Sequence, residues 1–319
     1  MVPTLAVICL LRHARTRCTL GKTEVGLRAG DLSMSAWKLR LALIAVTAAV
    51  LVAGAAGCSQ TAKHVSGASP GAVITALGGT PFGVSATSGT SAWAVGSYST
   101  ATGSRTLILR WNGTSWSKVA SPNPGPSYND LHGVSATSGT SAWAVGSYTT
   151  ATGYRTLILR WNGTSWSKVA SPNPGSDNVL LGVSATSGTS AWAVGFYSTG
   201  TGSRTLILRW NGTAWSKAAS PNPASYSILR GVSARSETSA WAVGNYSPTT
   251  HNFRTLILRW NGTAWSKAAS PNPVPGYDIL FGVSATCGSN AWAVGYYLTA
   301  SGSSRTLVLH WNGTSWSRT

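Results

Sequence analysis

The sequence predicts an all-β protein, a five-bladed β-propeller of four-stranded antiparallel blades, preceded by an N-terminal signal-peptide helix. The segment GVSA begins at residues 83, 133, 182, 231 and 282, so a unit of 49 to 51 residues recurs five times. Only 9% of the chain is charged, and Gly, Ser, Thr and Trp fill the units, a composition typical of short strands and tight turns. Repeats of this length and strand content predict sheets arranged radially.

Four strands are expected in every unit. In the first unit they are residues 83–87, 92–96, 105–111 and 115–120. A longer loop over residues 97–104 joins the second strand to the third. Asn112-Gly113 predicts a hairpin turn between the third and fourth strands, because both central residues of such a turn need positive φ. The segment SPNP, residues 121–124, ends the unit, since proline cannot continue a ladder.

The third strand predicts sheets that are covered on both faces. Side chains alternate along it, so one face carries Leu107, Leu109 and Trp111, and the other carries Thr106, Ile108 and Arg110. The arginine stem can lie along a neighbouring sheet while its head reaches water. Most of the tryptophans, which occupy fixed places within the strands, are expected in the core. A single small sheet cannot cover two such faces, whereas five radially arranged sheets can.

The segment VGSY, followed by TLILRWNGTSWSKV, resembles the kelch repeat, whose signature is a glycine pair, a tyrosine and a later tryptophan. Gly96, Tyr98 and Trp116 fill these places in the first unit. The second glycine of the pair is replaced in the five units by Ser97, Ser147, Phe196, Asn245 and Tyr296. The resemblance covers residues 83–319 and implies a propeller. It also implies one function, a protein-interaction scaffold.

The N-terminal residues indicate export. Residues 1–33 carry no readable fold, and because Met34 begins a complete signal we expect them to be a non-native upstream extension. Residues 34–57 form the expected signal peptide, with a basic start and an uncharged apolar run. A flexible linker is expected over residues 58–71 and the propeller over residues 72–319. Residues 72–77 (AVITAL) predict a strand that completes or reinforces the last blade.

The residues around Cys58 indicate how the chain is anchored. Ala55, Ala56, Gly57 and Cys58 resemble a bacterial lipobox, which implies that Cys58 is diacylated and becomes the mature N-terminus. The alternative is an ordinary signal peptide or an uncleaved anchor, in which Cys58 is incidental. We therefore expect an exported protein, lipid-anchored at the extracytoplasmic face of a bacterial membrane or secreted.

The charge points to acidic partners. The net charge is +18, and from Cys58 onward 17 basic and 4 acidic residues leave +13. Acidic glycans, cell-wall polyanions and nucleic acid are the anionic polymers that suit such a chain. The cations are spread evenly, so inheritance of the same cations by each repeat explains the charge equally simply, and we favour that interpretation. We do not expect nucleic acid as the partner.

One end of the blades varies between repeats and is the expected ligand surface. It is formed by the loops between second and third strands and by the connections between units. The candidate binding residues are Tyr98, Tyr148, Tyr154, Phe196, Tyr197, Tyr246, Phe253, Tyr296 and Tyr297. Loop drift, or a structural role for the tyrosine after each second strand, explains the same pattern. A glycan or cell-wall polymer is the first expected ligand, and an envelope protein is the alternative.

No pattern of catalytic residues stands out. From Cys58 onward the acids are Asp130, Asp177, Glu237 and Asp278, scattered singly, whereas sugar hydrolysis needs two carboxylates at a set separation. The histidines show no metal-ligand spacing, and no cofactor motif is present. We therefore expect a binding protein without enzymatic activity, metal or cofactor. Convergence of Asp130, Asp177 and Asp278 on one face, giving an enzyme of unknown reaction, is the alternative.

Overall fold

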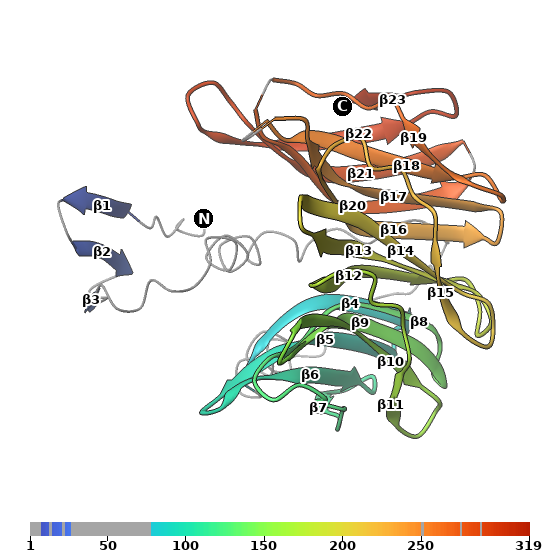
Figure 1. The fold of residues 1–319 in the computed structure, drawn as a ribbon. Coiled ribbons are helices and arrows are strands. Elements are labelled where there is room, and N and C mark those ends of the chain that lie inside the picture. The colour runs from blue at the N-terminus through green and yellow to red at the C-terminus, as the bar shows by residue number, and fades with distance from the viewer. Residues whose placement is uncertain are drawn as a thin grey trace. The chain divides into compact units, whose positions relative to one another are not determined.

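The computed structural model describes residues 8–12, 15–20, 23–26, 78–249, 252–274, 276–287 and 289–319 (Figure 1). The chain divides into two compact units, Met1–Gln60 and Thr61–Thr319. The expected signal helix, the linker, Cys58 and the strand over residues 72–77 all lie outside the described residues. Within the described ranges, no helix has the length and apolar character needed to span a membrane.

Met1–Gln60 contains a small antiparallel sheet, in a region where the sequence predicts no fold. Its strands are β1 (Ile8–Arg12), β2 (Arg15–Leu20) and β3 (Thr23–Gly26), paired in that order. These segments contain the β-branched residues Ile8, Thr16, Thr19, Thr23 and Val25, which suit paired strands even though no repeat marks them.

The described residues of Thr61–Thr319 form five groups of four antiparallel strands, here called blades 1 to 5, and blades 3 and 4 belong to one eight-stranded sheet. Blade 1 consists of β4 (Thr80–Ser88), β5 (Ser91–Thr100), β6 (Gly103–Trp111) and β7 (Trp116–Lys118). Blade 2 consists of β8 (Asn129–Ser138), β9 (Ser141–Thr150), β10 (Gly153–Trp161) and β11 (Trp166–Val169). Blade 3 consists of β12 (Asn178–Ala185), β13 (Ala191–Thr199), β14 (Gly202–Trp210) and β15 (Trp215–Ala218).

Blade 4 consists of β16 (Tyr226–Ser236), β17 (Ser239–Ser247), β18 (Arg254–Trp260) and β19 (Trp265–Ala268). Blade 5 consists of β20 (Asp278–Cys287), β21 (Asn290–Leu298), β22 (Ser304–Trp311) and β23 (Trp316–Arg318). A single parallel pair, Ser203 with Tyr226, joins blades 3 and 4. The prediction of four antiparallel strands per unit and of a β-propeller fold is confirmed.

The expected loop over residues 97–104 is mostly strand. Tyr98 pairs with Arg105, and Thr100 pairs with Gly103, so only two residues remain in the turn. Gly103 has φ +127°, a conformation that glycine adopts without strain. The loop prediction is wrong because threonine and tyrosine favour paired strands, so the hairpin extends to its tightest turn.

The first strands of neighbouring blades approach closely at the glycine of GVSA. A Cβ atom added to Gly83 would lie 2.9 Å from the carbonyl oxygen of His132 and 3.2 Å from the Cα atom of Gly133. The approach recurs between Gly182 and Gly231. The amide of Ala136 donates a 3.0 Å hydrogen bond to the Ser85 hydroxyl, and this bond recurs at the next three junctions. The repeat therefore keeps glycine and serine there because neighbouring strands need contact and a hydrogen bond.

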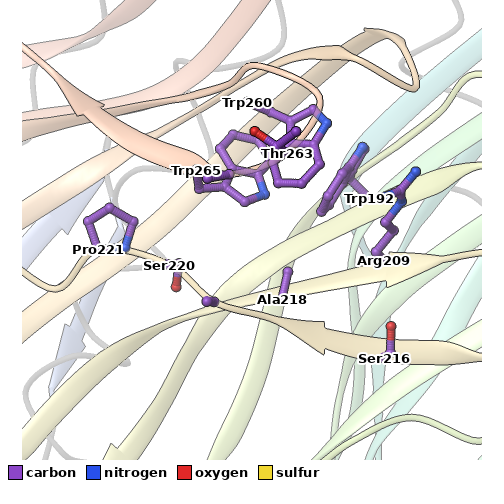
Figure 2. A pocket seen from close by; sticks show the side chains of 11 residues that line it. Trp192, Arg209, Ser216, Ala218, Ser220, Pro221, Trp260, Thr263 and Trp265 are labelled. Carbon is purple, nitrogen blue, oxygen red and sulfur yellow. The ribbon is translucent and has the colours of Figure 1, made fainter.

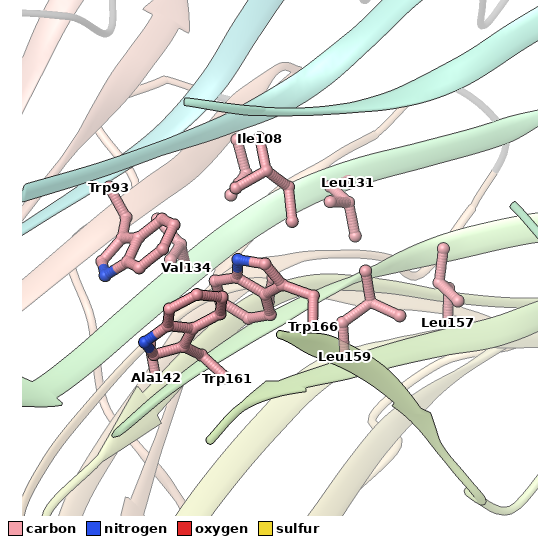
Figure 3. Packing of buried hydrophobic residues seen from close by; sticks show 11 residues of the cluster. Trp93, Ile108, Leu131, Val134, Ala142, Leu157, Leu159, Trp161 and Trp166 are labelled. Atoms are coloured by element: carbon pink, nitrogen blue, oxygen red, sulfur yellow. The ribbon is translucent and has the colours of Figure 1, made fainter. Parts of the chain in front are cut away.

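Each junction between blades is filled by one core cluster (Figure 3). At the first junction, Trp93 of blade 1 packs against Trp161 and Trp166 of blade 2, with ring centroids 4.9 and 5.1 Å apart. Ile108 belongs to this cluster, whereas Leu107 and Leu109 face the other side of blade 1. The predicted alternation along the third strand is therefore confirmed, and most tryptophans are core residues.

The SPNP segment does more than end a blade, because it runs back along the third strand. The Asn123 side-chain oxygen accepts a 2.8 Å hydrogen bond from the amide of Thr106, and the Thr106 hydroxyl lies 2.6 Å from that of Ser121. The same contacts recur in blades 2, 3 and 4. The SPNP segment thereby gives hydrogen-bond partners to the part of the third strand that the short fourth strand does not reach.

The five repeats predict a propeller whose blades form a closed circle. Among the described residues, the core clusters join consecutive blades, and none joins blade 5 to blade 1. Trp292 of blade 5 is accordingly 41% exposed, whereas its four counterparts in blades 1 to 4 are at most 2% exposed. Val294 is likewise 41% exposed, and Val84 of blade 1 is 64% exposed. Ring closure is therefore not formed within the described part of the chain.

Candidate binding grooves between the blades

Two grooves open at consecutive junctions. The groove between blades 3 and 4 has a volume of about 410 Å³ (Figure 2). It is lined by Trp192, Arg209, Ser216, Ala218, Ala219, Ser220, Pro221, Trp260, Thr263, Ala264 and Trp265. The groove between blades 4 and 5 has a volume of about 330 Å³ and is lined by the counterparts Ala268, Ala269, Ser270, Trp311, Thr314, Ser315 and Trp316. The two grooves share one construction because the lining segments are repeats of each other.

Small side chains on the fourth strand make the hollow. Along β15, Ser216 and Ala218 point to the groove, and Lys217 points to the opposite face. Figure 2 shows Trp260 and Trp265 on the other side of the space from Ser216 and Ala218. Alanine and serine leave volume that a larger residue would fill, so the groove follows directly from the WSKAAS segment.

The turn between the third and fourth strands of the next blade closes the groove. The Asn261 side-chain oxygen accepts hydrogen bonds from the amides of Thr263 and Ala264, at 3.0 and 2.9 Å. Gly262 has φ +101°, as the Asn-Gly pair predicted. The turn is thereby fixed, and it presents the Thr263 hydroxyl at the rim.

An arginine beside two tryptophan rings also lines the groove. The Arg209 guanidinium lies 5.3 Å from the ring centre of Trp192 and 5.7 Å from that of Trp260. It therefore bridges blades 3 and 4, and it is partly exposed. Arg110, Arg160 and Arg259 make the same pair of contacts at the other three junctions.

Five of the nine predicted site residues occupy equivalent places and contact a cation of their own blade. Lys118 lies 3.4 Å from the ring centre of Tyr98, and the Lys168 ammonium donates a 3.0 Å hydrogen bond to the Tyr148 hydroxyl. Tyr197, Tyr246 and Tyr297 make the corresponding contacts with Lys217, Lys267 and Arg318. These tyrosines also pack against the blade core.

The other four predicted site residues are distributed over different blades. Phe253 lies 5.3 Å from Tyr226 and 4.9 Å from Tyr277 between ring centroids. Tyr296 stacks on Phe281 at 5.8 Å. Phe196 pairs with Val179 in blade 3, and Tyr154 donates its amide to Asp177. None of the nine lines either groove.

The acidic residues occupy separate blades. The Asp130 carboxylate accepts a 2.7 Å hydrogen bond from the Ser104 hydroxyl. Burial lowers the pKa of His132, and Asp130 opposes that shift. Asp278 is fully buried at the start of β20, and burial raises its pKa to about 6. Within the described residues, no group of three His, Cys, Asp or Glu side chains lies close enough to hold a metal ion.

The comparisons concern folds. No protein-family model and no curated protein matches the chain, so the kelch resemblance stays a prediction. Among solved structures, "YCF48 bound to D1 peptide" is 14% identical, covering 75% of this chain and 80% of its own, with a TM-score of 0.43. The six-bladed lectin of Aleuria aurantia is 11% identical, with coverages of 75% and 77% and a TM-score of 0.46. A thermostable family-43 glycoside hydrolase is 9% identical, with coverages of 75% and 92% and a TM-score of 0.47.

The expectation of a protein without enzymatic activity is contradicted by these comparisons. The family-43 protein and four further matches are named as glycoside hydrolases, a β-fructofuranosidase or a polysaccharide lyase. The expectation rested on four acids that lie singly in different units, and it kept the convergence of Asp130, Asp177 and Asp278 on one face as an alternative. With TM-scores below 0.5, the matches assign no reaction and no ligand to this chain.

Sequence reasoning also missed the grooves. It directed attention to segments that vary between repeats, whereas the groove residues come from WNGT and WSKA, which hardly vary. A usable signal was present, because Ala218 and Ala268 stand where blades 1 and 2 have Val119 and Val169, and the smaller side chain leaves space that core packing would normally fill.

Proposed function

We propose that this protein binds polysaccharide through the grooves between its blades. The observation that carries the proposal is the recurrence of one groove construction at consecutive junctions. Each groove combines the edges of largely buried tryptophan rings with serine and threonine hydroxyls. Sugar rings present an apolar face and a rim of hydroxyls, so both kinds of group have a partner in such a groove.

Repetition suits a polymer ligand. A single shallow groove offers little contact area and binds weakly. Two or more equivalent grooves on one chain engage successive segments of the same polymer, so that the second contact is made at a high effective concentration. The proposal includes a location, the extracytoplasmic surface of a bacterial cell, with the chain held by lipid on Cys58. That part rests on the sequence of residues 34–58 alone.

A polysaccharide array probed with the full chain in detergent tests the proposal. The variant A219W/A269W places a large side chain at exposed positions that line both grooves, and it leaves every tryptophan of the core clusters in place. The control A101W places the same side chain on the exposed turn of blade 1. We expect a polysaccharide signal that the double variant loses and the control keeps. An array without any signal, or a signal that survives A219W/A269W, contradicts the proposal.

A further inference from the structure

We propose that the polymer held in these grooves is acidic, with carboxylate, sulfate or phosphate groups, and that it runs across successive junctions. This inference rests on the proposed function and names its ligand class. It follows from where the structure places the cations, a placement that the even spread of charge along the sequence conceals.

Each junction carries one arginine from the preceding blade, beside two tryptophan rings. These arginines are Arg110, Arg160, Arg209 and Arg259. The guanidinium carbon of Arg209 lies 5.3 and 5.7 Å from the centres of two tryptophan rings. The edge of the guanidinium keeps N–H donors in the geometry that binds carboxylate, sulfate or phosphate in a bidentate manner.

The following blade adds a second cation beside each groove. In β19, Trp265 lines the groove, and Lys267, two residues further on, lies on the same face of the strand. Lys168, Lys217 and Arg318 occupy this place in blades 2, 3 and 5, and all are exposed. Two cations therefore recur at every junction, which matches a polymer with regularly spaced negative groups.

The partners that we find for these cations are neutral. They are the tryptophan rings, the tyrosine hydroxyls and, for Arg160, the carbonyl oxygen of Gly188. Of the acids, Asp130 and Asp177 accept hydrogen bonds at the opposite ends of the blades, from Ser104 and from the amide of Tyr154. The arginines and lysines at the junctions can therefore bind an anion from outside the protein.

One junction departs from this pattern. Glu237 takes the place that Gly89, Gly139 and Gly188 hold in the first three blades. Its carbonyl oxygen accepts a 2.8 Å hydrogen bond from the Trp260 indole, and its side chain is exposed. A carboxylate thus lies next to the groove between blades 3 and 4, and it opposes an acidic ligand at this junction alone.

The groove construction favours an acidic polysaccharide over a single-stranded nucleic acid. Bases bind such proteins by stacking on exposed aromatic faces. Trp260 and Trp265 are only 7% and 6% exposed, so the grooves offer ring edges and hydroxyls in place of stacking platforms. Small hydroxylated grooves suit sugar units, whose charge is then met by the arginine and the lysine.

The experiment compares polygalacturonate with its fully methyl-esterified form, which has the same backbone without charge, and with oligo-dT. The full chain is titrated with each at 50 and 200 mM salt. We expect polygalacturonate to bind at least about tenfold more tightly than the ester at 50 mM salt, and to weaken steeply at 200 mM as counterions are released. Oligo-dT should bind more weakly than polygalacturonate.

Matched variants locate the charge. R209Q/R259Q removes the arginines of the two junctions that carry grooves, and R204Q/R254Q removes two arginines from the same strands, on the opposite face and five residues away. The first should weaken polygalacturonate binding about tenfold or more and lower the salt slope by roughly two. The second should have a much smaller effect. Melting temperatures of both variants show that the blades remain folded.

The outcomes separate this inference from the proposed function. If acid and ester bind equally and A219W/A269W abolishes both, the grooves bind sugar but the ligand is not selected by charge, and this inference is overturned. Equal weakening by R209Q/R259Q and R204Q/R254Q also overturns it, as does tighter binding of oligo-dT. If no polysaccharide binds, on the array or in the titrations, the proposed function fails together with it.

Discussion

Replacing Asp278 by asparagine should stabilise the protein at neutral and alkaline pH. Asn129 and Asn178 occupy the same place in blades 2 and 3. There the Asn129 side-chain oxygen accepts a hydrogen bond from the Gly125 amide at 2.6 Å, and its NH₂ group donates to the Gly125 carbonyl at 3.0 Å. Among the described residues, neither oxygen of Asp278 has a hydrogen-bond partner.

The pKa of Asp278 sets the size of the stabilisation expected for D278N. Burial raises it from 3.8 to about 6, and Arg254 opposes the shift. The folded chain then holds a proton that the unfolded chain has lost between pH 4 and pH 6, so the free energy of unfolding falls as pH rises through this window. The difference corresponds to about 3 kcal/mol as an upper figure. The contribution of the protonated Asp278 carboxyl to the free energy of unfolding is fully present below pH 4 and absent above pH 6.

Urea unfolding of wild type and D278N at pH 4.5 and pH 8 tests this. We expect D278N to exceed wild type by about 2 to 3 kcal/mol at pH 8 and by much less at pH 4.5. The reverse change, N178D, should lose a similar amount at pH 8 only. Comparing each variant with wild type at the same pH removes the contribution of His132. An equal difference between wild type and D278N at both pH values would refute the reasoning.

Three further predictions follow from the packing and the charges. Gly182→Ala should lower the free energy of unfolding by about 1 to 3 kcal/mol, because its Cβ would lie 2.9 Å from a neighbouring carbonyl oxygen; Gly139→Ala, where nothing lies within 4 Å, should change it little. Trp143→Ala should cost about 3 to 5 kcal/mol in urea unfolding. Trp292→Ala, at a 41% exposed site, should cost clearly less, and equal losses would contradict the exposed face of blade 5. Glu237→Gly should tighten polygalacturonate binding. Unchanged affinity in the same titration would show that the Glu237 carboxylate does not affect the electrostatic potential at the groove between blades 3 and 4.

Much of the fold was readable because its signals are local. The Asn112-Gly113 turn, the proline stop and the alternation of Leu107 and Ile108 each depend on a few neighbouring residues, and the structure confirms them. The loop prediction for residues 97–104 was wrong because threonine and tyrosine pair across a hairpin whenever the turn allows it. Its failure also moved the predicted tyrosines from loop tips into strands.

The sequence by itself determined the repeat, the four strands of each unit and the two apolar faces, since these follow from periods of two and about fifty residues. Only the tertiary structure decided what happens between units. It placed Arg209 between Trp192 and Trp260, hollowed the groove beside Ala218, and buried Asp278 where blades 2 and 3 have asparagines. Contacts between residues some fifty positions apart depend on how one sheet packs on the next, and no local pattern of side chains encodes that distance.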